Sequence, residues 1–128
     1  MSNNIQTQIG QRIKSFQYAF EGVFYVLKTQ KNAWIHAVFT IAAIIMGFWL
    51  AISRQDWALL TLTIALVWIA EFFNTAVESL IDMTMPDPHP LAKVAKDVCA
   101  GAVLVVAIAA AVVGLLILGP PLWEALFN

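Results

Sequence analysis

Three long apolar segments constrain this chain of 128 residues more than any other feature of its sequence. The first segment, residues 33–53, contains no Asp or Glu and no Lys or Arg. As a helix it would be about 31 Å long, which is the thickness of the hydrocarbon core of a bilayer. Residues 57–85 and 98–118 form the other two segments. Since a backbone in lipid must satisfy its own hydrogen bonds, the sequence predicts three transmembrane helices and an all-α integral membrane fold.

The overall composition agrees with a membrane location, because 61% of the residues are hydrophobic and 12% are charged. Soluble domains typically contain about 25% charged residues. The net charge of −1 and the lack of a dense Lys and Arg run argue against nucleic acid as a partner. The length allows a single domain, residues 1–128.

The N-terminal stretch, residues 1–32, differs from the three segments because its apolar residues recur every three or four positions. This spacing is typical of an amphipathic helix. The chain has too few other residues to form a soluble core against such a helix, so we expect it to lie on the membrane surface. The apolar positions are Ile5, Ile9, Ile13, Phe16, Phe20, Phe24 and Leu27.

Prolines at alternate positions interrupt the chain after the second segment, so residues 86–97 are predicted to form a loop and the start of the next helix. The run Gly119-Pro120-Pro121 is expected to end the third segment. Basic residues lie before the first segment and in the proline-rich loop, whereas Arg54 is the one basic residue between the first two segments. The positive-inside rule therefore places the N-terminus and this loop in the cytoplasm.

The later half of the second segment carries a polar stripe, since Glu71, Asn74, Glu78 and Asp82 follow one another at spacings of three or four residues. A carboxylate at membrane depth is costly unless it is paired, neutralised or bound to a metal. Three carboxylates on one stripe repel one another, and their hard oxygen atoms suit Mg²⁺. Glu71 lies deepest and is suited to act as a general base. Alternatively, the stripe holds helices together through interhelical hydrogen bonds.

A second polar cluster, residues 89–97, lies on the same side of the membrane as the lower end of the stripe. Lys93 is interpreted as an interfacial anchor. Lys96 could contact phosphate oxygens and Asp97 their metal. Phosphate, metal and a base at the membrane surface suggest phosphoryl transfer to a lipid headgroup. The glycine-rich loops of soluble nucleotide-binding proteins are absent from the sequence.

These two clusters resemble the signatures of the small prokaryotic diacylglycerol kinases and the related undecaprenol kinases, and the similarity extends over residues 12–114. This resemblance implies an ATP- and Mg²⁺-dependent lipid kinase in the bacterial inner membrane. It also implies a homotrimer of three-span subunits with active sites at the cytoplasmic face. The matching motifs are Glu71-x-x-Asn74-Thr75-Ala76-Val77-Glu78-x-x-Ile81-Asp82 and Ala95-Lys96-Asp97-x-x-Ala100-Gly101-Ala102-Val103.

The resemblance also assigns roles to individual residues. Glu71 corresponds to the proposed base for the lipid hydroxyl group, and Glu78 to a metal-binding carboxylate. Asn74, Lys96 and Asp97 correspond to positions around the nucleotide phosphates and their metals.

Two further positions are implied less directly. His89 corresponds to a position near the adenine, with a solvated loop histidine as the alternative. Gln30 stands where the family has a metal-binding glutamate, and an amide oxygen can bind Mg²⁺ but contributes no negative charge. We therefore expect an active enzyme with a raised demand for Mg²⁺.

The sequence leaves two lipid substrates open, namely diacylglycerol, giving phosphatidate, and undecaprenol, giving undecaprenyl phosphate. Residues 32–36 and 89–93 are more similar to the undecaprenol kinase branch. Outside the enzymes, the chain could be a non-catalytic small membrane subunit or an ion-conducting oligomer with an acidic intramembrane stripe.

Overall fold

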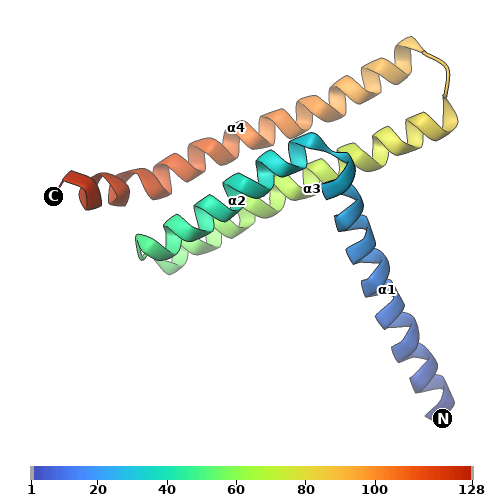
Figure 1. The fold of residues 1–128 in the computed structure, drawn as a ribbon, viewed down its shortest axis with the longest axis horizontal. Coiled ribbons are helices and arrows are strands. Elements are labelled where there is room, and N and C mark those ends of the chain that lie inside the picture. The colour runs from blue at the N-terminus through green and yellow to red at the C-terminus, as the bar shows by residue number, and fades with distance from the viewer. Residues whose placement is uncertain (1, 128) are drawn as a thin grey trace.

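The computed structural model describes the backbone of residues 2–127 and the side chains of residues 8–127, so that Met1, Asn128 and the side chain of Ile5 lie outside the described residues. The described residues form no strand and four helices, α1 (Ser2–Thr29), α2 (Lys31–Trp49), α3 (Arg54–Thr84) and α4 (Pro90–Phe127). Helices α2, α3 and α4 lie side by side and alternate in direction, while α1 points away from them (Figure 1). The predicted all-α fold with an N-terminal helix is confirmed.

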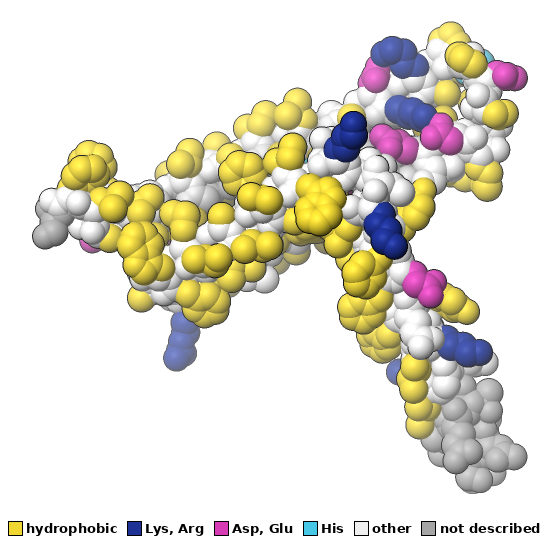
Figure 2. Space-filling model, in the orientation of Figure 1, with side chains coloured by type: hydrophobic (Ala, Val, Ile, Leu, Met, Phe, Trp, Pro, Cys, Tyr) yellow, Lys and Arg dark blue, Asp and Glu magenta, His cyan; other side chains and the backbone are white. Residues whose placement is uncertain are grey.

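Helices α2, α3 and α4 are each long and apolar enough to cross a membrane. The 19 residues of α2 correspond to about 28 Å of helix. Figure 2 shows apolar side chains over the bodies of these helices and charged side chains gathered where α3 turns into α4. Large side chains such as Phe39, Leu62 and Leu115 are exposed in one copy of the chain. Lipid or a neighbouring subunit is therefore needed to cover this surface.

The turn between α2 and α3 is set by local contacts, and α2 ends at Trp49 rather than at the predicted residue 53. Ala51 has a φ of 49°, a left-handed conformation that stops the helix. Ser53 then caps α3, since its Oγ accepts a hydrogen bond of 3.2 Å from the Asp56 amide. Gly47 completes the turn by leaving room for the indole of Trp57.

Helix α4 begins at Pro90, where the missing amide hydrogen of proline has no intrahelical partner to lose. The expectation that Gly119-Pro120-Pro121 ends this helix is wrong, because α4 continues to Phe127. The fixed φ of proline is compatible with helical backbone, and each ring removes one hydrogen bond to the preceding turn. Neighbouring groups in membrane helices tolerate such losses.

A single residue separates α1 from α2. Gln30 has an extended backbone, with φ −100° and ψ 115°, and its side chain makes no capping hydrogen bond. The chain therefore changes direction sharply, with Val26 and Ala33 buried on either side of the junction. Other apolar residues of α1, including Phe16 and Phe20, remain exposed, and the placement of α1 on a membrane surface stays a prediction.

Candidate active site

Polar side chains connect α3 with α2 and with the residue that precedes α2. Because α2 and α3 run antiparallel, residues later in α2 contact residues earlier in α3. The three contacts are Gln30 with Glu78, His36 with Glu71, and Thr40 with Trp68. The polar stripe predicted for α3 therefore includes two residues, Glu71 and Glu78, that contact this neighbouring part of the chain.

The carboxylate of Glu78 is held by two amide groups. Gln30 donates a hydrogen bond of 3.2 Å from Nε2 to Oε2, and Asn74 donates one of 3.2 Å from Nδ2 to Oε1. Asn74 is 8% exposed, and its Oδ1 atom is buried without a hydrogen-bond partner. The structure thus brings together three of the five residues that the resemblance places around the metal and the phosphates, and Gln30 contacts Glu78 through its nitrogen atom.

Glu71 is the most buried polar residue of the described chain, with 1% of its surface exposed. Neither of its carboxylate oxygens has a hydrogen-bond partner among the described residues. His36 Nε2 lies 3.9 Å from Glu71 Oε2, and this distance is too long for a hydrogen bond. Buried polar atoms without partners are rare and costly, so Glu71 is set apart from residues that only stabilise the helix pair.

His36 was not among the site residues predicted from the sequence. An ionisable side chain within an otherwise uncharged membrane segment is itself a signal of function. The role of His36 depends on which residue of α3 it faces, and the sequence pattern does not give the register between α2 and α3.

The second polar cluster lines a pocket of about 650 Å³ formed by the end of α3, the proline-rich loop and the start of α4. His89, Lys96 and Asp97 all line this pocket, whereas Glu71 and Glu78 do not. Lys96 forms an ion pair with Asp82, and Lys93 forms one with Asp97.

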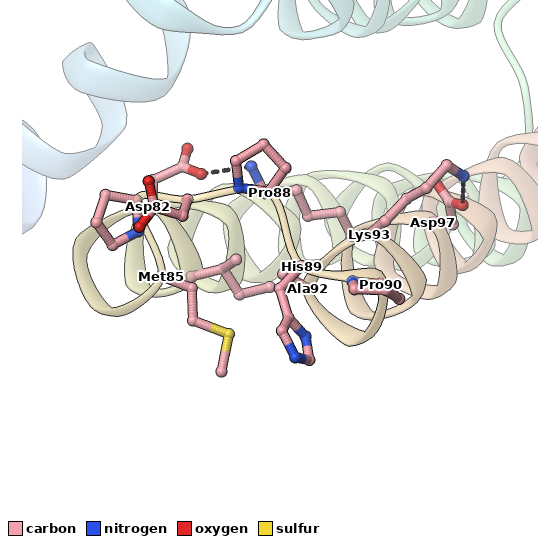
Figure 3. Close-up of a pocket in the computed structure, with 12 residues that line it drawn as sticks. Asp82, Met85, Pro88, His89, Pro90, Ala92, Lys93 and Asp97 are labelled. Atoms are coloured by element: carbon pink, nitrogen blue, oxygen red, sulfur yellow. Dashed lines mark hydrogen bonds and ion pairs between the residues drawn. The ribbon is translucent and has the colours of Figure 1, made fainter.

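His89 has a structural role in this arrangement. Its side chain points away from Asp82 and Asp97 (Figure 3). Its Nδ1 accepts a hydrogen bond of 3.2 Å from the amide of Leu91, so that His89 caps the N-terminus of α4.

A smaller cavity of about 310 Å³ lies between α1 and α3. Its lining is mostly apolar and includes Gly22 and Val26 from α1 and Phe72 and Thr75 from α3. Thr75 is buried, and its hydroxyl group donates a hydrogen bond of 2.9 Å to the backbone carbonyl of Glu71. The cavity therefore lies beside the helical turn that carries Glu71.

The oxygen donors around Glu78 decide whether the site could hold Mg²⁺. Among the described side chains, no group of three or more His, Cys, Asp or Glu is placed to hold a metal ion. The Glu78 carboxylate and the unpartnered Oδ1 of Asn74 are nevertheless hard oxygen donors. Since Mg²⁺ is commonly bound by one or two carboxylates together with substrate phosphates, these residues fit a metal that arrives with a polyphosphate.

Comparison with known proteins identifies the family. The family model for prokaryotic diacylglycerol kinase matches residues 17–118. The chain belongs to the prokaryotic diacylglycerol kinase family. All the predicted site residues, from Gln30 to Asp97, lie inside the matched region. The resemblance to this family that the two motifs indicated is confirmed.

Relatives in this family carry two names. A diacylglycerol kinase of Synechocystis sp. is 48% identical over 109 residues, which is 84% of this chain and 62% of that protein. The undecaprenol kinase of Bacillus subtilis is 36% identical over 121 residues, covering 94% of this chain and 98% of the relative. A diacylglycerol kinase of Escherichia coli is 29% identical over 119 residues, with 88% and 91% covered. The chain thus spans less than two thirds of the Synechocystis protein.

Proposed function

We propose that this chain is a lipid kinase that transfers the γ-phosphoryl group of ATP to a hydroxyl group of a membrane lipid. The family supports this class of reaction. The observation that carries the proposal is the placement of Glu71, a carboxylate 1% exposed and without a hydrogen-bond partner among the described residues. It lies two helical turns from Glu78, which is held by Gln30 and Asn74.

In the proposed reaction, Glu71 orients the lipid hydroxyl group and accepts its proton. Mg²⁺, when bound, neutralises charge on the phosphate oxygens. Glu78 and Asn74 would hold it. The family resemblance adds Gln30 and Asp97 as two further residues that would lie near the metal. Phosphoryl transfer through a loose transition state depends on in-line positioning and electrostatic stabilisation more than on a strong base.

The nucleotide is proposed to occupy the pocket at the α3–α4 loop. Its volume of about 650 Å³ lies within the usual range of about 300–1,000 Å³ for ligand sites. The ammonium group of Lys96 pairs with Asp82, and phosphate oxygens would compete for it with charge-assisted hydrogen bonds. His89, on the loop, is proposed to contribute to adenine binding.

Diacylglycerol and undecaprenol both remain proposed acceptors, because the relatives are named for one or the other. Both lipids present a hydroxyl group at the membrane surface, and their chains differ in apolar parts that protein surfaces discriminate weakly. We further propose a homotrimer in the bacterial inner membrane with a cytoplasmic N-terminus. The exposed apolar faces of the spans and the distribution of basic residues support this arrangement.

A direct transfer assay tests the function. Protein in detergent micelles is incubated with Mg²⁺, ATP labelled at the γ-phosphate, and either diacylglycerol or undecaprenol, and the lipids are then extracted. We expect label in the lipid fraction with at least one alcohol. An unlabelled lipid fraction with both alcohols would favour a non-catalytic membrane subunit or an ion-conducting oligomer.

A further inference from the structure

His36 and Glu71 face each other across the interface between α2 and α3, and neither His36 Nε2 nor the two Glu71 oxygens has a hydrogen-bond partner among the described residues. We propose that His36 is a further catalytic residue, and that its Nε2 group and the Glu71 carboxylate together hold the acceptor hydroxyl group. This inference rests on the proposed lipid kinase function and adds to it a second contact to the reacting oxygen atom.

The separation of the two side chains fits a bridging hydroxyl group. Nε2 and Oε2 are 3.9 Å apart, beyond direct hydrogen bonding. An oxygen atom about 2.8 Å from each of them fits beside the line that joins them. It would accept a hydrogen bond from His36 and donate one to Glu71, which satisfies one buried donor and one buried acceptor with a single group.

Another contact between α2 and α3, one helical turn away, can be compared with the His36–Glu71 pair. There, Trp68 Nε1 donates a direct hydrogen bond of 3.2 Å to Thr40 Oγ1. Helices α2 and α3 are thus close enough for direct side-chain hydrogen bonds one turn away from His36. The longer distance between His36 and Glu71 therefore reflects how these two side chains are placed, because the helices themselves are not too far apart for a direct hydrogen bond.

The burial of the pair requires a route for the lipid. Glu71 is 1% exposed, and the His36 side chain is 13% exposed. The apolar cavity between α1 and α3 is lined by Phe72 and Thr75, which lie one and four residues after Glu71 on α3. A lipid entering from this cavity would meet apolar surface before its hydroxyl group reached the pair.

The chemistry assigns different roles to the two residues. The hydroxyl oxygen forms a bond to the γ-phosphorus of ATP, and the bond between that phosphorus and the β–γ bridging oxygen breaks to release ADP. The hydroxyl proton passes to the Glu71 carboxylate. His36 keeps its proton, because Nε2–H is a donor in one neutral tautomer and in the imidazolium form, and its hydrogen bond orients the attacking oxygen.

A kinetic comparison tests this role with three variants. His36→Leu removes the donor, His36→Gln keeps an N–H donor, and Thr40→Val removes the neighbouring interhelical hydrogen bond as a matched structural control. We expect His36→Leu to lower kcat for lipid phosphorylation about 10²-fold with an unchanged KM for ATP. His36→Gln should recover much of the loss, and Thr40→Val should keep the wild-type kcat. A wild-type kcat in His36→Leu, or an equal loss in Thr40→Val, would overturn the inference.

Binding provides a readout that is independent of turnover. The unfolding temperature in detergent is measured with dioctanoylglycerol or farnesol, and with the matched analogues in which hydrogen replaces the hydroxyl group. We expect at least one alcohol to raise the unfolding temperature of the wild type more than its analogue does, and this difference to vanish in His36→Leu. If the alcohol and its analogue shift the unfolding temperature of the wild type equally, the inference that His36 and Glu71 bind the hydroxyl group would be overturned, even if lipid is phosphorylated. A hydroxyl preference without label transfer to lipid would instead contradict the proposed function alone.

Discussion

Gln30 donates a hydrogen bond of 3.2 Å to Glu78 from the single extended residue between α1 and α2. The break between the two helices places this side chain against α3, 48 residues further along the chain. The resemblance implies a glutamate at this position. In this chain, an amide therefore contacts Glu78 where a second carboxylate would repel it.

The first prediction concerns Gln30→Glu. This variant replaces a hydrogen bond with repulsion between two carboxylates, which a divalent cation relieves. Without Mg²⁺ we expect a lower unfolding temperature than in the wild type, corresponding to a loss of about 1–2 kcal/mol. Added Mg²⁺ should stabilise the variant more than the wild type, and half-maximal activity should require less Mg²⁺.

Gln30→Ala serves as the control, because it removes the amide without adding charge. Its stability should not gain the additional dependence on Mg²⁺. Titrations with Mg²⁺ that coincide for the wild type and Gln30→Glu would refute the role assigned to this position.

The second prediction separates the two lysines at the start of α4. Lys96 pairs with Asp82 between two helices, whereas Lys93 pairs with Asp97 one turn away on the exposed surface of α4. Lys96→Ala should raise the KM for ATP about 10- to 100-fold, as expected for the loss of a charge-assisted hydrogen bond to phosphate. Lys93→Ala should change it little, because exposed ion pairs contribute little. Equal effects of the two substitutions on KM would argue against a phosphate contact by Lys96.

The third prediction concerns the turn between α2 and α3. A Cβ atom at Gly47 would lie 2.9 Å from the indole of Trp57, so Gly47→Ala forces this ring to shift. We expect a loss of about 1–3 kcal/mol in the free energy of unfolding, measured by denaturant titration in detergent. Gly119→Ala is the control, since nothing lies within 4 Å of its Cβ position. Similar stability of the two variants would show that the packing of Trp57 does not define this turn.

Much of the fold follows from sequence patterns with a direct physical cause. Apolar runs that match the bilayer thickness predicted α2, α3 and α4, and a period of three to four residues predicted α1. Helix ends were predicted less well, because they depend on contacts between distant residues. The turn after Trp49 involves the packing of Gly47 against Trp57. Pro120 and Pro121 do not end α4, since their φ is compatible with a helix.

In the candidate site, too, local sequence patterns were predictive, whereas contacts between helices were not. The spacing of Glu71, Asn74 and Glu78 predicted one face of α3, because that periodicity is local. The partners of these residues depend on how α2 lies against α3, so His36 was missed. Lys96 was predicted to contact phosphate, while its pairing with Asp82 arises only because the proline-rich loop returns α4 alongside α3.

The most direct test of the central claim compares the initial rate of labelled phosphate transfer to lipid in the wild type, Glu71→Gln and Glu124→Gln, with ATP binding measured in parallel. Glu124→Gln is the control, because this exposed glutamate lies at the far end of α4, outside both polar clusters. The account predicts that Glu71→Gln folds and binds ATP as the wild type does, yet transfers phosphate to lipid about 10²- to 10⁴-fold more slowly. A wild-type transfer rate in Glu71→Gln would contradict the account.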